Sequence, residues 1–244
     1  MGTQLRGELR FILFLVVAVL LLSETWLNKT RAMEQGPLAQ VRYRLDASKS
    51  AFMARAFSGG LLWFKGHDHF ITVKDFDGEV TVTPDTILPA SIQMTVKTNS
   101  MVETRDVFTE PQKQIINKEL REIVLETEKY PEMTFRSTNV NGKMNSNGVF
   151  EAKVEGDLLM HGVTRRIVIP ADVTLVGNEL RSKGEFSIDR GDFNVKATSA
   201  FHGMVRVRDQ VKITFNLVAN RSATARADSS IKPLRPLNSQ NHLR

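Results

Sequence analysis

His67 and His69 are the two side chains whose types and spacing are best suited to chemistry. In an extended strand, residues two apart point to one face, so both imidazoles could reach one metal ion or one anionic head group. His161 and His202, which each precede a glycine, could supply further ligands if the fold brings them close. A metal site needs a third ligand and supporting partners. We therefore interpret the pair first as hydrogen-bonded polar residues at a strand bend, and keep metal binding as a hypothesis.

The sequence lacks the patterns that signal an enzyme. There is no glycine-rich phosphate loop after a strand, no Gly-x-Ser-x-Gly and no His-Glu-x-x-His. The chain has no cysteine, which excludes disulfides, thiolate metal sites and cysteine nucleophiles. Asp68 and His69 are adjacent, so in a strand they point to opposite faces and cannot act as an acid–base pair. We expect a protein that is not an enzyme, has no catalytic residues and requires no cofactor.

A second candidate site consists of large apolar side chains, which could line a lumen. Each methylene group taken out of water is worth about 0.8 kcal/mol, so a long apolar chain needs no polar contact to bind. Each residue could equally fill a core, because alternation along a strand does not separate a lumen from a packed interior. The candidates are Phe52, Phe57, Phe64, Met94, Phe135, Leu158, Met160, Phe186, Ile188, Phe201 and Phe215.

Alternating apolar and polar residues dominate the chain between residues 41 and 220, and this period of two predicts half-buried antiparallel strands. The odd-numbered residues of 163–175 and of 205–217, for example, are mostly apolar. After some runs merge, we expect about eight to ten strands. The runs are 41–46, 50–57, 61–65, 69–76, 79–83, 90–98, 132–140, 148–160, 164–176, 179–188 and 203–219. Turn signals stand at Ser58-Gly59-Gly60, Asp77-Gly78, Asn141-Gly142, Asn147-Gly148 and Gly177-Asn178.

The stretch 110–128 departs from this period, because its apolar residues fall near helical spacing among Lys and Glu. Pro111 suits a first helical turn, and Tyr130-Pro131 ends the run. We expect one amphipathic helix, or two short ones, inserted between strands. A sheet of this length with one apolar face must close into a barrel or fold into a sandwich to bury that face. A closed barrel of about eight strands has room for one elongated apolar ligand.

The two ends of the chain differ from its middle. Arg6 and Arg10 precede the apolar run 11–22, whose helical length of about 18 Å is short of the roughly 30 Å hydrocarbon core and suits a signal peptide. Extension to residue 27 gives an uncleaved anchor instead. We expect residues 1–32 to be a signal peptide or membrane anchor, 33–40 a linker, 41–220 the barrel domain and 221–244 a basic, disordered tail.

The formal charge of +6 lies mostly outside the expected barrel. Residues 221–244 hold five basic residues and one acidic residue, a net charge of +4, and residues 1–40 contribute +1. The expected barrel is therefore nearly neutral at +1. The sequence pI near 9.6 therefore does not indicate a basic binding surface on the barrel, and we expect no nucleic-acid partner.

Four segments in order resemble the YceI-like family of exported bacterial proteins, across nearly the whole of 41–220. They are Tyr43-Arg44-Leu45-Asp46, the run Lys129-Tyr130-Pro131-Glu132-Met133-Thr134-Phe135-Arg136-Ser137, the run Glu155-Gly156-Asp157-Leu158-Leu159-Met160-His161-Gly162-Val163-Thr164-Arg165, and Ile188-Asp189-Arg190-Gly191-Asp192-Phe193-Asn194-Val195. The third contains His161-Gly162, which we interpret as a strand-to-strand turn.

The resemblance implies a mainly β fold, an antiparallel lipocalin-like barrel with a short helical insertion, exported to the periplasm. It also implies a long lipid, such as a polyisoprenoid, bound inside the barrel. Two positions depart from the family: Lys49-Ser50 stands where many members have His-Ser, and Arg105-Asp106 is not followed by the usual histidine. The pair His67 and His69 is a feature of this chain and is not part of the family pattern.

The expected function is that of an exported protein that holds a polyisoprenoid, quinone or fatty-acid-like lipid in a barrel cavity. The protein would be soluble in the periplasm after cleavage, or anchored to the inner membrane by residues 11–27. Its expected partners are the lipid, the membrane if the N-terminal segment stays, and a second copy in a homodimer. The alternatives are a metal site at the histidines, or a filled sandwich that acts as a non-lipid stress or assembly factor of the cell envelope.

Overall fold

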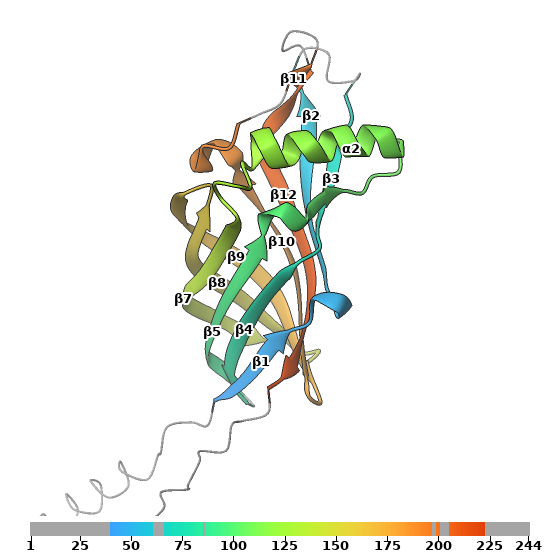
Figure 1. The fold of residues 1–244 in the computed structure, drawn as a ribbon. Helices are drawn as coiled ribbons and strands as arrows, with labels where there is room; N and C mark the ends of the chain where they lie inside the picture. The colour runs from blue at the N-terminus through green and yellow to red at the C-terminus, as the bar shows by residue number, and fades with distance from the viewer. Residues whose placement is uncertain (1–39, 61–65, 85, 197–198, 201–204, 223–244) are drawn as a thin grey trace, which may run out of the picture. The chain divides into compact units, whose positions relative to one another are not determined.

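The computed structural model describes residues 40–60, 66–84, 86–196, 199–200 and 205–222, and most of these form strands of one antiparallel sheet (Figure 1). The strands are β1 (Val41–Leu45), β2 (Ala51–Gly59), β3 (His69–Val73), β4 (Phe76–Thr83), β5 (Ile87–Lys97), β6 (Met101–Glu103), β7 (Glu132–Met144), β8 (Phe150–Met160), β9 (Val163–Val176), β10 (Glu179–Asp189), β11 (Ser199–Ala200) and β12 (Val205–Arg221). The helical segments are η1 (Ala47–Lys49), η3 (Thr98–Ser100), α2 (Glu110–Glu119), η4 (Leu120–Val124) and η5 (Arg190–Phe193).

Eight of the described strands close into a ring. Hydrogen bonds join β1, β4, β5, β7, β8, β9, β10 and β12 in that order. β1 pairs with β12, with Leu45 opposite Ala219, and this pairing completes the circle. All neighbours in the ring are antiparallel. The predicted antiparallel barrel is therefore confirmed, and a sandwich is not the fold.

Strands β2, β3 and β6 extend the wall beyond this ring. β2 pairs with β12 between Arg206 and Asn216, β3 pairs with β2, and β6 pairs with β3. In the described sheet β6 does not pair with β7, so the wall is split there. The chain from β6 to β7 forms α2 and η4. α2 crosses the end of the barrel where β2 and β3 project beyond the ring (Figure 1). The Glu103 backbone N–H donates to Asn117 Oδ1 at 2.7 Å, which ties α2 to β6.

The helix predicted within 110–128 is present as α2, followed directly by the π-helical η4. Thr109 and Gln112 form a capping box at its start, in which the Thr109 backbone N–H donates to Gln112 Oε1 at 2.8 Å. Pro111 lies in the first turn, where it displaces no helical hydrogen bond. None of the helices among the described residues is both long and apolar enough to cross a membrane.

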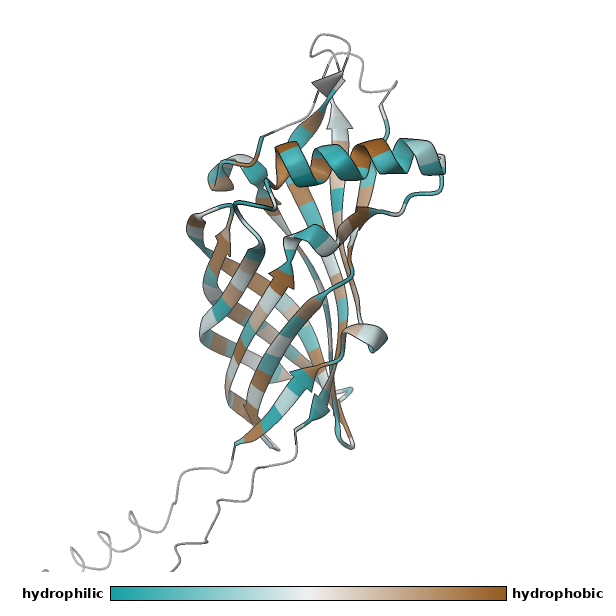
Figure 2. Ribbon diagram, viewed as in Figure 1, coloured by the Kyte–Doolittle hydropathy of each residue, from teal (hydrophilic) through white to brown (hydrophobic). Residues whose placement is uncertain are grey.

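The barrel wall keeps one apolar and one polar face, as the alternation in the sequence predicts. Figure 2 shows hydrophobic and hydrophilic residues alternating along the strands. On β9, Ile167 and Ile169 are half-buried while Val168 between them is 52% exposed. The inward residues of the different strands join into one apolar cluster with members from both the ring and its extension.

The end of the barrel where β9 turns into β10 is closed, and we call it the closed end. Phe150, Leu180 and Ala219 are 3%, 3% and 0% exposed there. Leu180 pairs with Ala219, and Phe150 pairs with Val173 on β9. Burying these side chains contributes about 1.5–3 kcal/mol for each large one, so this end provides much of the packing free energy.

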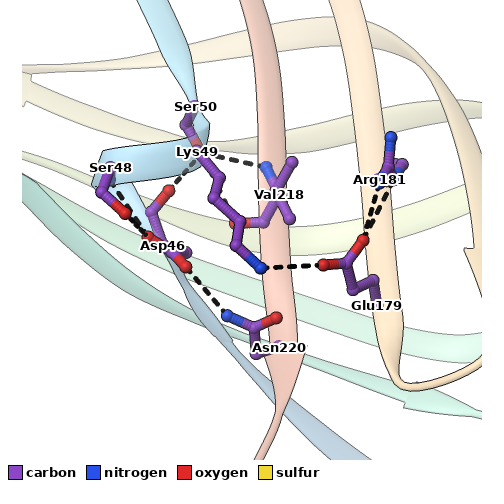
Figure 3. A network of polar contacts seen from close by, with 8 residues as sticks. All are labelled: Asp46, Ser48, Lys49, Ser50, Glu179, Arg181, Val218 and Asn220. Carbon is purple, nitrogen blue, oxygen red and sulfur yellow. Dashed lines mark hydrogen bonds and ion pairs between the residues drawn. The ribbon is translucent and has the colours of Figure 1, made fainter.

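A polar network joins the strands at the closed end (Figure 3). Asp46 accepts hydrogen bonds from Ser48 Oγ at 2.6 Å and from Asn220 Nδ2 at 3.0 Å, and the bonds from Ser48 lower the pKa of its carboxyl most strongly. Ser50 Oγ accepts from the Val218 backbone N–H at 2.9 Å and donates to the Asp46 carbonyl at 2.6 Å. Lys49 forms an ion pair with Glu179 on β10 at 3.0 Å. Lys49 and Ser50, which stand where many members of the resembled family have His-Ser, therefore form contacts that join strands of the barrel wall.

Two of the predicted turns are wrong. Gly78 lies inside β4 and Gly142 inside β7. A Cβ on Gly78 would stand 2.6 Å from the Gln93 carbonyl oxygen, and one on Gly142 2.3 Å from that of Glu151. These glycines allow neighbouring strands to approach closely, a role that an isolated glycine in a strand pattern also signals. The turns at Asn147-Gly148 and Gly177-Asn178 are confirmed.

Three predictions concern residues outside the described ones: the leader or anchor with its linker up to residue 39, the strand at 61–65, and the tail beyond residue 222. Two short strands, β6 and β11, were not expected. Each has three residues or fewer, too few for a periodic pattern to stand out.

Candidate functional site

The barrel encloses a cavity of about 510 Å³. This volume lies within the range of small-molecule pockets. Eight of the apolar residues singled out from the sequence line it: Phe52, Met94, Phe135, Leu158, Met160, Phe186, Ile188 and Phe215. They come from β2 and from five strands of the ring, and Leu45, Val80 and Ile167 add β1, β4 and β9, so every strand of the ring contributes to the lining.

Phe57 is not among the cavity-lining residues, and its placement corrects the sequence-based expectation. Phe52, Ala54 and Ala56 of β2 face the cavity, so Phe57, with odd parity, points to the outer face. There the guanidinium of Arg55 lies 4.7 Å from the centre of its ring. Phe64, Phe201 and His202 lie outside the described residues.

Aromatic rings inside the barrel pack over glycines of the neighbouring strand. A Cβ on Gly184 would lie 2.6 Å from Phe215 Cζ, and one on Gly156 2.5 Å from Phe135 Cζ. Phe186 contacts Phe215 edge-on, with ring centres 6.5 Å apart. The rings therefore lie against the wall, where the missing side chains make room for them, and the centre of the barrel is left hollow.

The α2–η4 segment covers one end of the cavity, which we call the mouth. Ile116, Leu120 and Val124 line the cavity, whereas Ile115 and Ile123 on the other side of the segment are 62% and 48% exposed. The cover is thus amphipathic in the sense expected from the sequence, with one apolar stripe against the barrel.

His67 and His69 also lie at the mouth, and both line the cavity. They share a face as predicted: the ring of His69 stacks on Phe108 with centres 5.3 Å apart, and His67 meets the same ring edge-on at 5.7 Å. Asp68 between them points the other way, where it accepts hydrogen bonds from Arg55 at 2.7 Å and from the Ser58 backbone N–H at 2.9 Å. Burial alone would raise the pKa of Asp68, but these bonds outweigh it and lower the pKa.

Glu103 of β6 holds His69 in place. His69 Nδ1 lies 2.8 Å from Glu103 Oε2, and Glu103 Oε1 accepts from the backbone N–H groups of Phe70 at 3.1 Å and Arg105 at 2.8 Å. The Glu103 side chain is fully buried. Burial acts to raise the pKa of this carboxyl, but the bonds from His69 and the two backbone amides outweigh it, so the pKa is lowered. His69 is therefore a hydrogen-bonded residue at the start of β3.

His161 lies in the two-residue turn between β8 and β9, which confirms the turn predicted there. His161 and Gly162 have φ values of 51° and 77°, the left-handed pair that tight hairpins need. The imidazole is buried against Tyr130, with ring centres 4.1 Å apart. Its Nε2 lies 2.7 Å from Glu126 Oε2 but out of line for a hydrogen bond, so neither ring nitrogen has a hydrogen-bond partner among the described residues. His161 does not line the cavity.

Among the described histidines, His161 does not join the pair His67 and His69. His69 is held by Glu103, whereas His161 packs against Tyr130 and Glu126 in a different turn. Across the described ranges, there is no group of three or more His, Asp or Glu residues that could hold a metal ion. The metal hypothesis, which required such a group, receives no support from this part of the chain.

Sequence reasoning missed Glu103 and the basic residues that line the cavity. Met101 and Glu103 are both buried members of β6, and their shared parity was the available signal that Glu103 points inward. Arg190, Lys196 and Arg206 also line the cavity. They belong to η5, the chain after it and the start of β12, where no common period links them.

Comparison with known proteins identifies a family and several proteins of similar sequence. The model of the YceI-like domain family matches residues 43–219. Protein YceI of Escherichia coli O6:H1 is 32% identical over 143 residues, which cover 56% of this chain and 66% of that protein. A UPF0312 protein of Pseudomonas syringae pv. tomato is 34% identical over 134 residues, 51% of this chain and 62% of that protein. The matches thus span less than two thirds of these relatives' length.

Solved structures share the fold. BcnA of Burkholderia cenocepacia superposes with a TM-score of 0.57 at 24% identity, over 72% of this chain and 99% of that one. A domain from Saccharophagus degradans, described as a polyisoprenoid binding domain, superposes with a TM-score of 0.53 at 16% identity, over 75% and 99%. At these identities the likeness concerns the fold.

Proposed function

This chain belongs to the YceI-like family, and from that premise we propose that it is a binding protein that holds a long apolar lipid in its barrel. The lipid class is a polyisoprenoid, the isoprenoid tail of a quinone, or a fatty-acid-like chain. Binding is non-covalent and driven by removal of the chain from water. The description of the Saccharophagus degradans domain as polyisoprenoid binding supports this class of ligand.

The observation that carries the proposal is the apolar cavity itself. About 510 Å³ of space is lined on every strand of the ring by inward apolar side chains. Each methylene group buried there contributes about 0.8 kcal/mol, so burial of a chain of ten carbons contributes roughly 8 kcal/mol. The loss of translational and conformational entropy on binding reduces this gain. The cavity is closed at one end by Leu180 and Leu217, so a chain enters from the mouth and lies along the barrel.

The test is to purify the protein, extract it with organic solvent and identify lipid by mass spectrometry. Ala54 faces the cavity and Ala51, on the same strand, is exposed on the outside. Ala54→Phe fills the lumen and Ala51→Phe is its matched control. We expect lipid in the wild type and in Ala51→Phe and its loss in Ala54→Phe, with thermal unfolding confirming that both variants fold. A wild type that carries no lipid and takes up no fluorescent isoprenoid would sink the proposal.

We also propose that the protein acts outside the cytoplasm, with residues 1–32 as a signal peptide or residues 11–27 as an inner-membrane anchor. The basic start and the twelve-residue apolar run support this. Cell fractionation, with N-terminal sequencing of the product, tests it. We expect the barrel in the periplasm or the inner membrane, and recovery of the full-length chain in the cytoplasm would contradict export.

A further inference from the structure

The wall of the barrel is split between β9 and β10. These two strands are paired at only five positions, from Glu179 opposite Val176 to Lys183 opposite Asp172. On their other sides, β9 pairs with β8 and β10 pairs with β12 at eleven positions each, along the full length of β8 and of β10. Beyond Lys183, towards the mouth, β9 and β10 have no paired register. The ladder that closes the wall elsewhere therefore stops there.

Pro170 of β9 gives a physical reason for the split. A Cβ on Gly184 would stand 2.4 Å from the Pro170 carbonyl oxygen, so Pro170 faces β10 at the point where the ladder would continue. Proline has no N–H to donate, and this interrupts a ladder of hydrogen bonds. Nearer the mouth, Arg165 Nε donates to the Asp192 carbonyl at 3.0 Å, which ties β9 to η5. The split is thus bounded by the ladder on one side and by this bond on the other.

Two isoleucines fill the split from inside. Ile167 and Ile188 stand six residues beyond Val173 and Ser182, which are paired, so the same register would place the isoleucines opposite each other. Both are half-buried and line the cavity. Both also line a second pocket of about 270 Å³, to which exposed Ser187 of β10 contributes. Ile167 and Ile188 therefore separate the cavity from a pocket on the outside of the wall, which we call the outer pocket.

The outer pocket has apolar as well as polar lining. Phe193, Arg165 and Arg166 contribute to it. The guanidinium of Arg165 is held by the Asp192 carbonyl, and Arg166 Nε donates to Asp157 Oδ1 at 2.7 Å. Arginine side chains lay their methylene stems along apolar surface while the charged end stays in water. The outer pocket therefore offers apolar contact beside the split, under a polar rim.

A chain longer than the lumen must leave part of itself outside. The cavity holds about 510 Å³ and is sealed at the closed end by Leu180 and Leu217. A chain that enters at the mouth and reaches this end has to stop, turn back or leave through the wall. Passage between Ile167 and Ile188 requires two side chains to rotate and breaks no paired position of the sheet. Passage between β8 and β9, or between β10 and β12, would break the ladder.

We propose that the split is a side opening of the cavity, through which the end of an apolar chain longer than the lumen passes between Ile167 and Ile188 into the outer pocket. This rests on the proposed function, because it assumes that the chain occupies the lumen. The lumen then sets no upper limit on chain length, and long linear polyisoprenoids bind as well as short ones.

The experiment compares prenyl alcohols that differ only in length, geranylgeraniol as the short chain and solanesol as the long one. Dissociation constants are measured by displacement of a fluorescent lipid. The proteins are the wild type, I167C/I188C and V173C/S182C, each double variant oxidised and reduced. Opposite residues on antiparallel strands suit a disulfide, and the chain has no cysteine of its own. I167C/I188C staples the split, and V173C/S182C is the matched control, because it staples a pair that the ladder already joins.

We expect the wild type to bind solanesol at least as tightly as geranylgeraniol. Oxidised I167C/I188C should bind solanesol about tenfold or more weakly and keep its affinity for geranylgeraniol, and reduction should restore the affinity for solanesol. V173C/S182C should bind both alcohols alike in its two redox states. Thermal unfolding of all forms confirms that they fold.

A second measurement detects the chain in the outer pocket and does not depend on a disulfide. Gln210 lines the outer pocket, whereas exposed Lys183 pairs with Asp172 beside the intact ladder. Bimane is attached to Q210C or, as the control, to K183C. Solanesol should shift the bimane emission of Q210C to shorter wavelength, geranylgeraniol should not, and neither alcohol should shift that of K183C.

A wild type that binds geranylgeraniol but excludes solanesol overturns the side opening and leaves the lipid-binding proposal intact. An oxidised I167C/I188C that keeps its affinity for solanesol also overturns it, as does an equal loss in V173C/S182C. If the I167C/I188C disulfide does not form, the bimane measurement decides, and an unshifted Q210C with bound solanesol overturns the proposal. If the wild type binds neither alcohol, the lipid-binding function fails and the side opening with it.

Discussion

The closed end and the mouth of this barrel are built from the same strands but from opposite kinds of residue. At the closed end, Leu180 and Ala219 are buried, and the polar groups around Asp46 are paired with one another. At the mouth, the side chains of Lys196 and Arg206 are exposed and have no hydrogen bond or ion pair with another described residue. β12 passes from one to the other along its length. The comparison indicates that apolar packing is concentrated at the closed end, whereas the mouth carries exposed charged side chains at the edge of the cavity.

The largest effect on stability should come from emptying the closed end. Phe150→Ala removes a ring that is 3% exposed, and we expect it to lower the free energy of unfolding by about 3–5 kcal/mol. Urea unfolding measures this change. Ile116→Ala, in the half-buried cover of the mouth, is the comparison and should cost much less. Similar losses in the two variants would break the contrast between the ends.

Glu103→Gln should have the next largest effect, because it changes a carboxylate that is fully buried at the mouth. Loss of the charged acceptor for His69 and two backbone amides should cost about 1–3 kcal/mol near neutral pH. The folded-state pKa of Glu103 lies below its ordinary value of 4.5, so the unfolded chain binds the proton more readily. Its stabilisation is therefore present above pH 4.5 and lost as the pH falls through the folded-state pKa.

Urea unfolding between pH 7 and pH 3 tests this prediction. The stability of the wild type should fall with acid more steeply than that of Glu103→Gln. Exposed Glu122→Gln serves as the control and should keep the wild-type slope. Parallel pH profiles for wild type and Glu103→Gln would show that the mouth does not depend on this carboxylate.

Ser50→Ala tests the polar network at the closed end. It removes the acceptor for the Val218 backbone N–H and the donor to the Asp46 carbonyl, and we expect a loss of about 1 kcal/mol. Ligand affinity should stay unchanged, because Ser50 does not line the cavity. A change in lipid affinity at constant stability would show that the two ends are coupled.

The smallest effect is expected on the outer wall between the two ends. Lys183 and Asp172 form an exposed pair 3.8 Å apart, and Lys183→Gln should change the free energy of unfolding by less than about 0.5 kcal/mol. The same urea titration provides the baseline against which the effects at the two ends are judged. A loss above 1 kcal/mol, on the order of one hydrogen bond, would mean that the outer wall contributes as much to the free energy of unfolding as the polar network at the closed end.

Sequence reasoning predicted the strands and the parity of their apolar face well where the period of two is long, as on β9 and β12. It failed where a residue's role depends on a neighbouring strand. Gly78 looks like a turn until Gln93 is known to lie beside it, and Phe57 looks like its neighbour Phe52 until the inner face of β2 is fixed. Ser199 and Arg206 come together through the pairing of β11 with β12, which no local pattern in the sequence indicates.

The pairing of β1 with β12 has a consequence for how the chain folds. Asp46 and Asn220, which are hydrogen-bonded at this seam, are 174 residues apart in sequence. During synthesis the barrel cannot close until its last strand has been made, and until then the edges of β1 and β10 lack their common partner. Closure over so long a loop is typical of slow folders. The late pairing of β1 with β12 therefore determines how long the growing chain exposes the apolar residues that line the cavity.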